Sequence, residues 1–165
     1  MLKNLFKKKE DMHNDVTLVA PVSGELVSLE EISDPVFAEK MMGDGIAIEP
    51  AIGELVSPVD GKIIQLFPTK HAIGIEAENG AEILLHIGLE TVNLNGEGFT
   101  AHVEEGKKVK QGDHLLSFDL DVIREKAQGT IIPIIITNTD DMSSIEPIDV
   151  KQATAGRDEI LVVKK

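Results

Sequence analysis

The sequence HAIGIEAENGAEILLHIG, residues 71 to 88, decides the fold class of this chain. Two runs rich in apolar residues flank the pair Asn79-Gly80, and Asn-Gly between such runs is the strongest short-range signal of a β-hairpin. A two-residue loop at this pair, or a symmetric four-residue loop, places Ile73 opposite His86. The stretch therefore predicts two antiparallel strands with one histidine at the outer end of each.

The two histidines of this hairpin are the first candidates for chemistry. In the predicted register, His71 and His86 project from one face as diagonal neighbours, about 7–8 Å apart at Cα. A three-residue loop would instead put them on opposite faces. We expect Ile73, Ile75 and Leu84 on the same face, and such an apolar surrounding lowers the pKa of an imidazole below its ordinary value of about 6.5. A neutral imidazole nitrogen is a good nucleophile, and a neighbouring imidazole can donate to the group under attack.

Outside the hairpin, the sequence has the pattern of an all-β protein. Short apolar or alternating runs are separated by proline, glycine, asparagine and aspartate, and helical patterns are scarce. We expect an antiparallel β-sandwich or flattened barrel with one or two short helices, at 119–128 and 35–39. The 165 residues fit a single domain at 16–165 behind a flexible basic tail at 1–15. Strands are predicted at residues 16–20, 24–28, 45–49, 53–57, 61–66, 72–77, 82–87, 100–102, 114–119, 132–136, 149–153 and 160–164.

The composition excludes several classes of function. The formal net charge of −13 opposes binding to nucleic acid, and the absence of cysteine excludes disulfides, thiolate zinc sites and cysteine nucleophiles. No apolar run approaches the ~20 residues of a membrane span, and no signal-peptide pattern is present, so we expect a cytoplasmic protein. Four lysines among the first nine residues indicate either a disordered tail or a weak contact with an anionic membrane surface.

The remaining histidines are expected to be ordinary surface residues. His13 lies in a polar lead-in, and His102 and His114 lie in short strand patterns beside charged residues. The sequence has no Gly-x-Ser-x-Gly motif and no glycine-rich loop that would hold a nucleotide phosphate, so no ATP site is expected. Any chemistry therefore centres on His71 and His86.

Residues 80–92, Gly-Ala-Glu-Ile-Leu-Leu-His-Ile-Gly-Leu-Glu-Thr-Val, resemble the glucose-type enzyme IIA component of the bacterial sugar phosphotransferase system. The resemblance extends from about Val16 to the C-terminus. Its supporting segments follow in order and at compatible spacing, at residues 34–38, 43–48, 69–72, 94–99 and 132–138. In this family the fold is the β-sandwich expected above, and the activity is that of a phosphotransferase component.

The resemblance implies a role for each residue of the pair. His86 would be the phosphoryl acceptor, modified at Nε2, with its Nδ1 held by the backbone carbonyl of Gly88. His71 would stabilise the phosphoryl group in transfer, and Thr69 would orient His71. No cofactor is required, because the group is carried covalently. Some relatives share a zinc ion with a partner through the two histidines, which makes them candidate shared ligands, although two ligands do not close a zinc site.

The resemblance also implies two partners. The donor would be the histidine-containing phosphocarrier protein (HPr), and the acceptor a cysteine on the IIB domain of a glucose-type sugar permease. Asp34 and Glu90 would flank the site, where their charges repel a phosphoryl dianion and keep phosphorylated His86 a good donor. The partners would dock on an apolar ring formed by Val36, Phe37, Met41, Met42, Phe67 and Leu84.

Three other kinds of protein remain open at this point. A zinc hydrolase on a related β-sandwich needs a third ligand, and none is evident near His71 or His86. A lipoyl- or biotin-carrying module is suggested by the Gly-x-x-Val-x-x-Gly-Asp pattern of residues 106–113, but the Asn79-Gly80 hairpin tip lacks a lysine. A non-catalytic binding module would use the apolar face alone.

Overall fold

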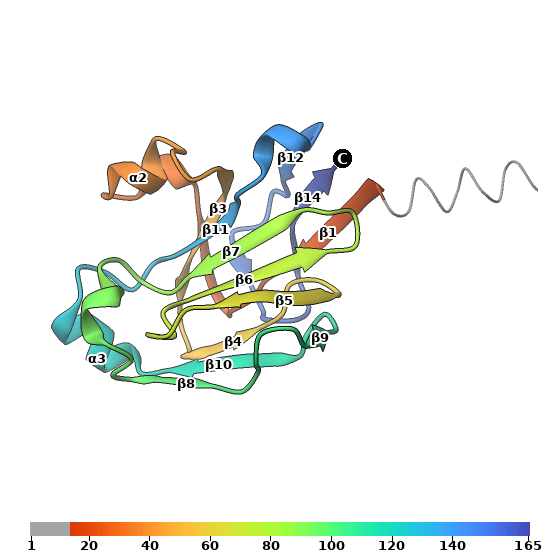
Figure 1. The fold of residues 1–165 in the computed structure, drawn as a ribbon. Coiled ribbons are helices and arrows are strands. Elements are labelled where there is room, and N and C mark those ends of the chain that lie inside the picture. The colour runs from red at the N-terminus through yellow and green to blue at the C-terminus, as the bar shows by residue number, and fades with distance from the viewer. Residues whose placement is uncertain (1–13) are drawn as a thin grey trace, which may run out of the picture.

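The computed structural model describes residues 14–165, whose main secondary structure is antiparallel strands (Figure 1). Two short α-helices interrupt the strands, α2 (Pro35–Ala38) and α3 (Leu120–Lys126), with 3-10 turns η1 (Leu29–Glu31), η2 (Thr91–Leu94) and η3 (Thr139–Asp141). The strands are β1 (Asp15–Val19), β2 (Gly24–Val27), β3 (Asp44–Pro50), β4 (Glu54–Val56), β5 (Gly61–Leu66), β6 (Ala72–Ala77), β7 (Glu82–His86), β8 (Phe99–Ala101), β9 (Lys108–Val109), β10 (His114–Phe118), β11 (Ile132–Ile136), β12 (Ser144–Pro147), β13 (Gln152–Ala153) and β14 (Glu159–Lys164).

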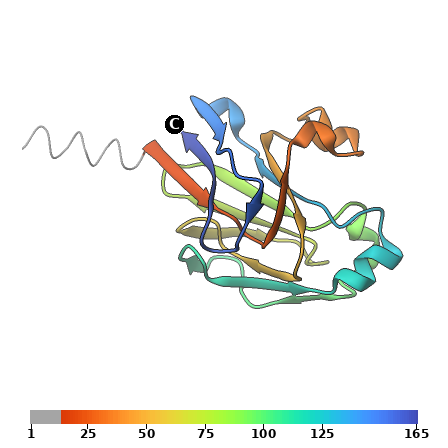
Figure 2. The same ribbon diagram turned by 180° about the vertical axis from the view of Figure 1, so that it is seen from behind.

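The strands form one large sheet and two small ones. The large sheet has the order β13-β2-β3-β11-β7-β6-β5-β9, and the small sheets have the orders β1-β14-β12 and β4-β10-β8. In Figure 1 the β4-β10-β8 sheet lies along one side of the β5-β6 pair, and both helices lie at the end of the β6-β7 hairpin that is remote from its loop. Figure 2 shows the β1-β14 pair from behind, at the opposite end from the helices. The predicted all-β fold is confirmed.

Two apolar clusters lie on opposite faces of the β7-β11 region. The main core takes one alternating set of side chains, such as Ile83 and Leu85 of β7, and a smaller cluster takes the other set, including Leu84 and Ile135. The η1-α2 segment covers the smaller cluster with Leu29, Ile32 and Phe37. Because each fully buried side chain of this size contributes roughly 1.5–3 kcal/mol, both faces of these strands are stabilised by burial.

The predicted strands match the observed ones closely. Each predicted run overlaps a strand, and three of the strands, at 61–66, 72–77 and 132–136, have the predicted bounds. The predicted helix at 119–128 is α3, capped by Asp119, whose carboxylate accepts from the amides of Asp121 and Val122. The short strands β9, of two residues, and β12, of four residues, were not predicted.

The predicted tail only partly overlaps the described residues. Residues 1–13, which include His13 and the segment expected to contact membranes, lie outside them. Asp15, which the sequence assigned to the tail, already pairs with Lys164 in β1. No helix within residues 14–165 is long and apolar enough to cross a membrane.

The predicted register of the hairpin is wrong by one residue. Ala72, rather than Ile73, pairs with His86, and a three-residue loop at residues 78–80 joins the strands. Asn79 explains the difference, because its side chain donates to the carbonyls of Asn14 and Val163 and accepts from Ala81 N–H. The contacts with Asn14 and with Val163 of β14 fix the loop. They could not be predicted from the sequence pattern of the hairpin, because both partners lie outside it.

The register change moves two of the expected neighbours away from the site. Ile73 and Ile75 point into the main core, on the face opposite to His86, so their predicted place beside the imidazoles is wrong. Leu84 shares the face of His86, as predicted, because the two residues are two apart on β7. Across the hairpin, Ala72 faces His86 and Gly74 faces Leu84.

Candidate functional site

The two histidine rings meet despite the three-residue loop. His71 lies just before β6, in a turn where Lys70 has a φ of 61° and donates to the carbonyl of Phe67. The backbone of His71 still accepts from Ile87 N–H at 2.7 Å, but its side chain is free of the strand's alternation. Its ring therefore packs against the ring of His86, with centroids 5.1 Å apart and planes at 80°.

His86 is held in one tautomer by the chain that follows it. As the last residue of β7, it places Nδ1 2.8 Å from the carbonyl oxygen of Gly88. A carbonyl only accepts hydrogen bonds, so Nδ1 carries the proton, and Nε2 of the neutral ring keeps its lone pair. The ring of Phe37 also packs against this imidazole, with centroids 5.1 Å apart.

Glycine is required at position 88. Its φ is +79°, and an added Cβ would lie 2.6 Å from Cγ2 of Thr91 and 2.9 Å from the carbonyl oxygen of Gly129. A larger residue would have to move the backbone that carries the Gly88 carbonyl. The sequence His-Ile-Gly therefore has a physical meaning, because the glycine lets the carbonyl turn back to the imidazole.

His71 is oriented by the residue two positions before it. Oγ1 of Thr69 lies 2.5 Å from Nδ1 of His71, and the ring of Phe67 packs edge-on at a centroid distance of 5.3 Å. The His71 side chain is almost fully buried, with 4% of its surface exposed. Thr69 and Gly88 thus make the contacts with His71 and His86 that the resemblance implies.

Both imidazoles are biased towards the neutral form. Burial lowers the pKa of His71 to about 4, and the nearby charge of protonated His86 contributes to the same direction. Burial also lowers the pKa of His86, while the bond to Gly88 and the charges of Asp34 and Glu90 oppose this shift. At neutral pH the site therefore presents an uncharged nucleophilic nitrogen.

The two carboxylates are placed by the turns that carry them. Asp34 caps α2, where its carboxylate accepts from Val36 N–H at 3.0 Å. Glu90 adopts a φ of 61° at the start of η2 and accepts from the side-chain amide of Asn93. Both negative charges favour the protonated ring and so oppose the lowering of the pKa of His86 by burial.

The residues expected to form a docking ring divide into two groups. Phe37 and Leu84 are 4% and 7% exposed, so they belong to the smaller apolar cluster and offer little surface to a partner. Val36 on α2 is 38% exposed, and Phe67 is partly buried beside His71. Met41 and Met42 are 69% and 37% exposed and line a surface groove with Thr137–Asp141.

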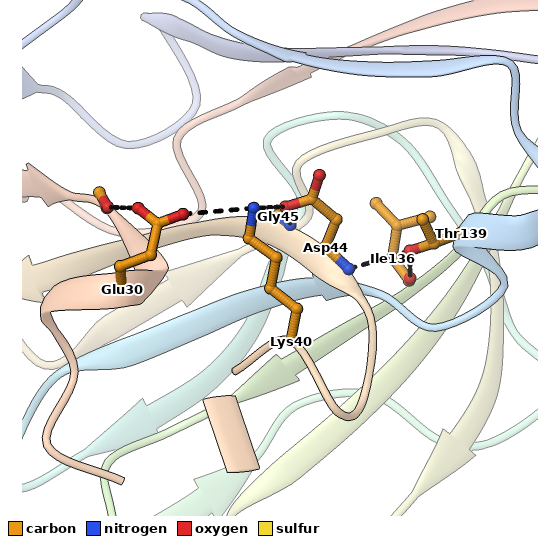
Figure 3. Close-up of polar contacts among 7 residues, drawn as sticks. Glu30, Lys40, Asp44, Gly45, Ile136 and Thr139 are labelled. Carbon is orange, nitrogen blue, oxygen red and sulfur yellow. Dashed lines mark hydrogen bonds and ion pairs between the residues drawn. The ribbon is translucent and has the colours of Figure 1, made fainter. Parts of the chain in front are cut away.

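The segment that carries Phe37 is anchored by charges that the sequence pattern did not reveal. Lys40 Nζ lies 3.3 Å from carboxylate oxygens of both Glu30 and Asp44, and Asp44 N–H donates to Thr139 Oγ1 (Figure 3). The pairs connect η1, the end of α2 and the start of β3. They hold the loop over the smaller apolar cluster, although each exposed pair contributes only about 0.2–1 kcal/mol.

Two other histidines lie on the surface of the β4-β10-β8 sheet. The rings of His102 and His114 stack with centroids 4.3 Å apart, and His114 contacts the carboxylate of Glu54. Both are exposed, as the sequence predicted, but their stacking was not foreseen. Within residues 14–165 no group of three or more histidine and acidic side chains has the geometry to hold a metal ion.

Fold and site together define a class of protein: an antiparallel β-sheet protein that carries a neutral, oriented imidazole pair on one face of its large sheet. Residues 16–142 match the family model described as phosphoenolpyruvate-dependent sugar phosphotransferase system, EIIA 1. The chain therefore belongs to this family, and the resemblance seen in the sequence is confirmed.

The relatives agree with this assignment over nearly the whole chain. The chain is 59% identical over 163 residues to the PTS system glucose-specific EIIA component of Oceanobacillus iheyensis, with 99% of each chain covered. It is 60% identical over 150 residues to the component of the same name from Bacillus cereus, with 91% of each covered. Its structure matches glucose permease IIA from Mycoplasma capricolum with a TM-score of 0.85 and 39% identity, covering 90% of this chain and 95% of that one.

Proposed function

We propose that this chain relays a phosphoryl group through Nε2 of His86. The donor is phosphorylated HPr and the acceptor is a cysteine on the IIB domain of a glucose-type permease. The family supports both partners and a cytoplasmic site of exchange. The observation that carries the proposal is the contact between His86 Nδ1 and the Gly88 carbonyl, because it leaves Nε2 unprotonated beside a second imidazole.

The transfer balances without an external acid or base. The lone pair of His86 Nε2 attacks phosphorus as the phosphorus–nitrogen bond of the donor breaks, and the proton stays on Nδ1. In the second step a cysteine thiolate attacks the same phosphorus, and the electron pair of the broken bond returns to Nε2. The group is carried covalently throughout, so the relay uses no cofactor and no nucleotide.

His71 assists the transfer through the tautomer of its neutral ring. When the hydroxyl of Thr69 donates to His71 Nδ1, the proton of the neutral ring lies on Nε2. That N–H can donate to an oxygen of the phosphoryl group at His86, since the two rings are edge to face. The pKa of about 4 keeps His71 neutral at working pH, so it supplies a hydrogen bond rather than a full charge.

Asp34 and Glu90 adjust the equilibrium of the relay. A negative charge near the phosphoryl dianion raises its energy, by about 1 kcal/mol at 4 Å in water and about 4 kcal/mol at an effective dielectric of 20. Phosphorylated His86 therefore remains a good donor. Val36, Phe67 and the methionines Met41 and Met42 are the exposed or partly exposed apolar residues available for docking.

Labelling tests the proposal directly. The protein is incubated with phosphoenolpyruvate, enzyme I and HPr, and acid-labile phosphate is mapped. We expect label on His86 in the wild type, none in His86→Gln, and label that is retained in His71→Gln but passed on slowly to the IIB domain. His102→Gln, which removes an exposed histidine of another sheet, is the matched control. Full labelling of His86→Gln would show that another residue accepts the group.

A further inference from the structure

The loop after His86 is held by contacts that the proposed function does not assign. The His86 tautomer depends on one carbonyl, that of Gly88, and a glycine with a φ of +79° has no side chain to fix its direction. Some other part of the molecule must set the two peptide planes on either side of Gly88. Both planes have identifiable partners.

The peptide between Gly88 and Leu89 is held from both ends. Its carbonyl accepts from His86 Nδ1, and its N–H donates to the carbonyl of Gly129 at 2.9 Å. The N–H of Gln128 then donates to the carbonyl of Leu89 at 3.1 Å. The chain that leaves α3 thus runs beside this loop and pairs with it at Leu89 and Gly129.

The peptide between Ile87 and Gly88 is held by a side chain. Oγ1 of Thr91 donates to the carbonyl of Ile87 at 2.6 Å. Thr91 has no exposed surface, and it is one of only a few polar residues that are buried in the described part of the chain. Its methyl group also closes the space next to Gly88, where an added Cβ would lie 2.6 Å from it.

We propose that Thr91 is a positioning residue for the relay. Its buried hydroxyl fixes the Ile87–Gly88 peptide and thereby directs the Gly88 carbonyl to Nδ1 of His86. The proton of the imidazole then stays on Nδ1, and Nε2 stays unprotonated. Thr91 touches neither the phosphoryl group nor a partner. It acts through the Ile87–Gly88 peptide on the orientation of the carbonyl in the next peptide, that of Gly88. The consequence for transfer rests on the proposed function, whereas the tautomer of His86 can be measured without any transfer.

The test compares three substitutions that grade the donor at one position. Thr91→Ser keeps the hydroxyl, Thr91→Cys offers a weak donor of similar size, and Thr91→Val keeps the shape without a donor. Nitrogen-15 NMR at mildly alkaline pH reports which nitrogen of His86 carries the proton. Labelling with phosphorylated HPr reports the rate of acceptance.

We expect the Nδ1–H tautomer to dominate in wild type and Thr91→Ser, to weaken in Thr91→Cys and to be mixed in Thr91→Val. The acceptance rate should fall about tenfold in Thr91→Val, the factor that corresponds to one buried hydrogen bond of ordinary strength. The graded series keeps the test decisive even where Thr91→Val folds poorly, because Thr91→Cys must still weaken the Nδ1–H tautomer relative to Thr91→Ser.

Ser57→Ala is the matched control. Ser57 is also fully buried and also donates its hydroxyl to a backbone carbonyl, that of Val59 at 2.7 Å, but it lies between β4 and β5, outside the loop that follows His86. It should lose thermal stability without any change in the His86 tautomer. A wild-type tautomer in Thr91→Val, or the same loss of acceptance in Ser57→Ala, would overturn the inference. Absence of label on wild-type His86 would instead refute the relay, and the NMR result would still decide the role of Thr91.

Discussion

Lowering the pH should destabilise the folded protein through His71 alone by roughly 3 kcal/mol. The pKa of His71 falls from 6.5 to about 4 on folding, mainly because burial disfavours the charged ring and secondarily because His86 lies beside it. At pH values between about 4 and 6.5, His71 is mostly protonated in the unfolded chain and mostly neutral in the folded chain. The free energy of unfolding is therefore highest above about pH 6.5, decreases as the pH drops, and loses no more through this group below about pH 4. A shift of about 2.5 units at 1.36 kcal/mol each gives the magnitude.

The assay is urea unfolding followed by circular dichroism, because the chain has no tryptophan or tyrosine for fluorescence. Between about pH 7 and about pH 4.5, wild type should lose about 2–3 kcal/mol more stability than His71→Gln, since most of the effect falls in this interval. The carboxylates and His86 are retained in both proteins, so their contributions largely cancel. His102→Gln should follow the wild type. An equal loss in wild type and His71→Gln would refute the assignment of this pH dependence to His71.

Three further predictions concern the loop, the charge and the hairpin tip. Gly88→Ala combines a positive φ with an added Cβ in a closed space, so it should lower the free energy of unfolding, measured by thermal unfolding, by about 2–4 kcal/mol. Gly106→Ala, at a φ of +87° with nothing within 4 Å, should lower it only by the backbone strain of about 1 kcal/mol. Asp34→Asn keeps the helix cap but removes a charge that raises the pKa of His86. The labelling equilibrium with HPr should therefore shift about fivefold towards this chain phosphorylated on His86. An unchanged equilibrium would contradict the electrostatic argument. Asn79→Ala breaks three hydrogen bonds at the hairpin loop. It should lower the free energy of unfolding by about 2–3 kcal/mol and make amide exchange at the loop faster. Unchanged exchange would count against the role of Asn79 in fixing the register.

The alternation of apolar residues was sufficient to place most strands. A strand repeats its side-chain direction every two residues, and Gly, Pro and Asn end each run, so residues 61–66, 72–77 and 132–136 could be delimited without any tertiary information. The helix cap at Asp119 is a local signal of the same kind. His71 and His86 could be selected because they are the two histidines of one hairpin, and the family resemblance implied which carbonyl would face the ring of His86.

Contacts between distant segments decided the rest, because no local pattern encodes them. Asn79 sets the hairpin register through Asn14 and Val163, and this moved Ile73 and Ile75 into the core. The rings of the pair meet because the turn before β6 releases the His71 side chain from the strand's alternation, which a hairpin drawn from the sequence does not show. The Gly129 carbonyl became a partner of the loop only because the chain after α3 packs beside it. Local periodicity thus fixed which residues form strands and which could react, while packing across the chain fixed the direction of each reacting atom.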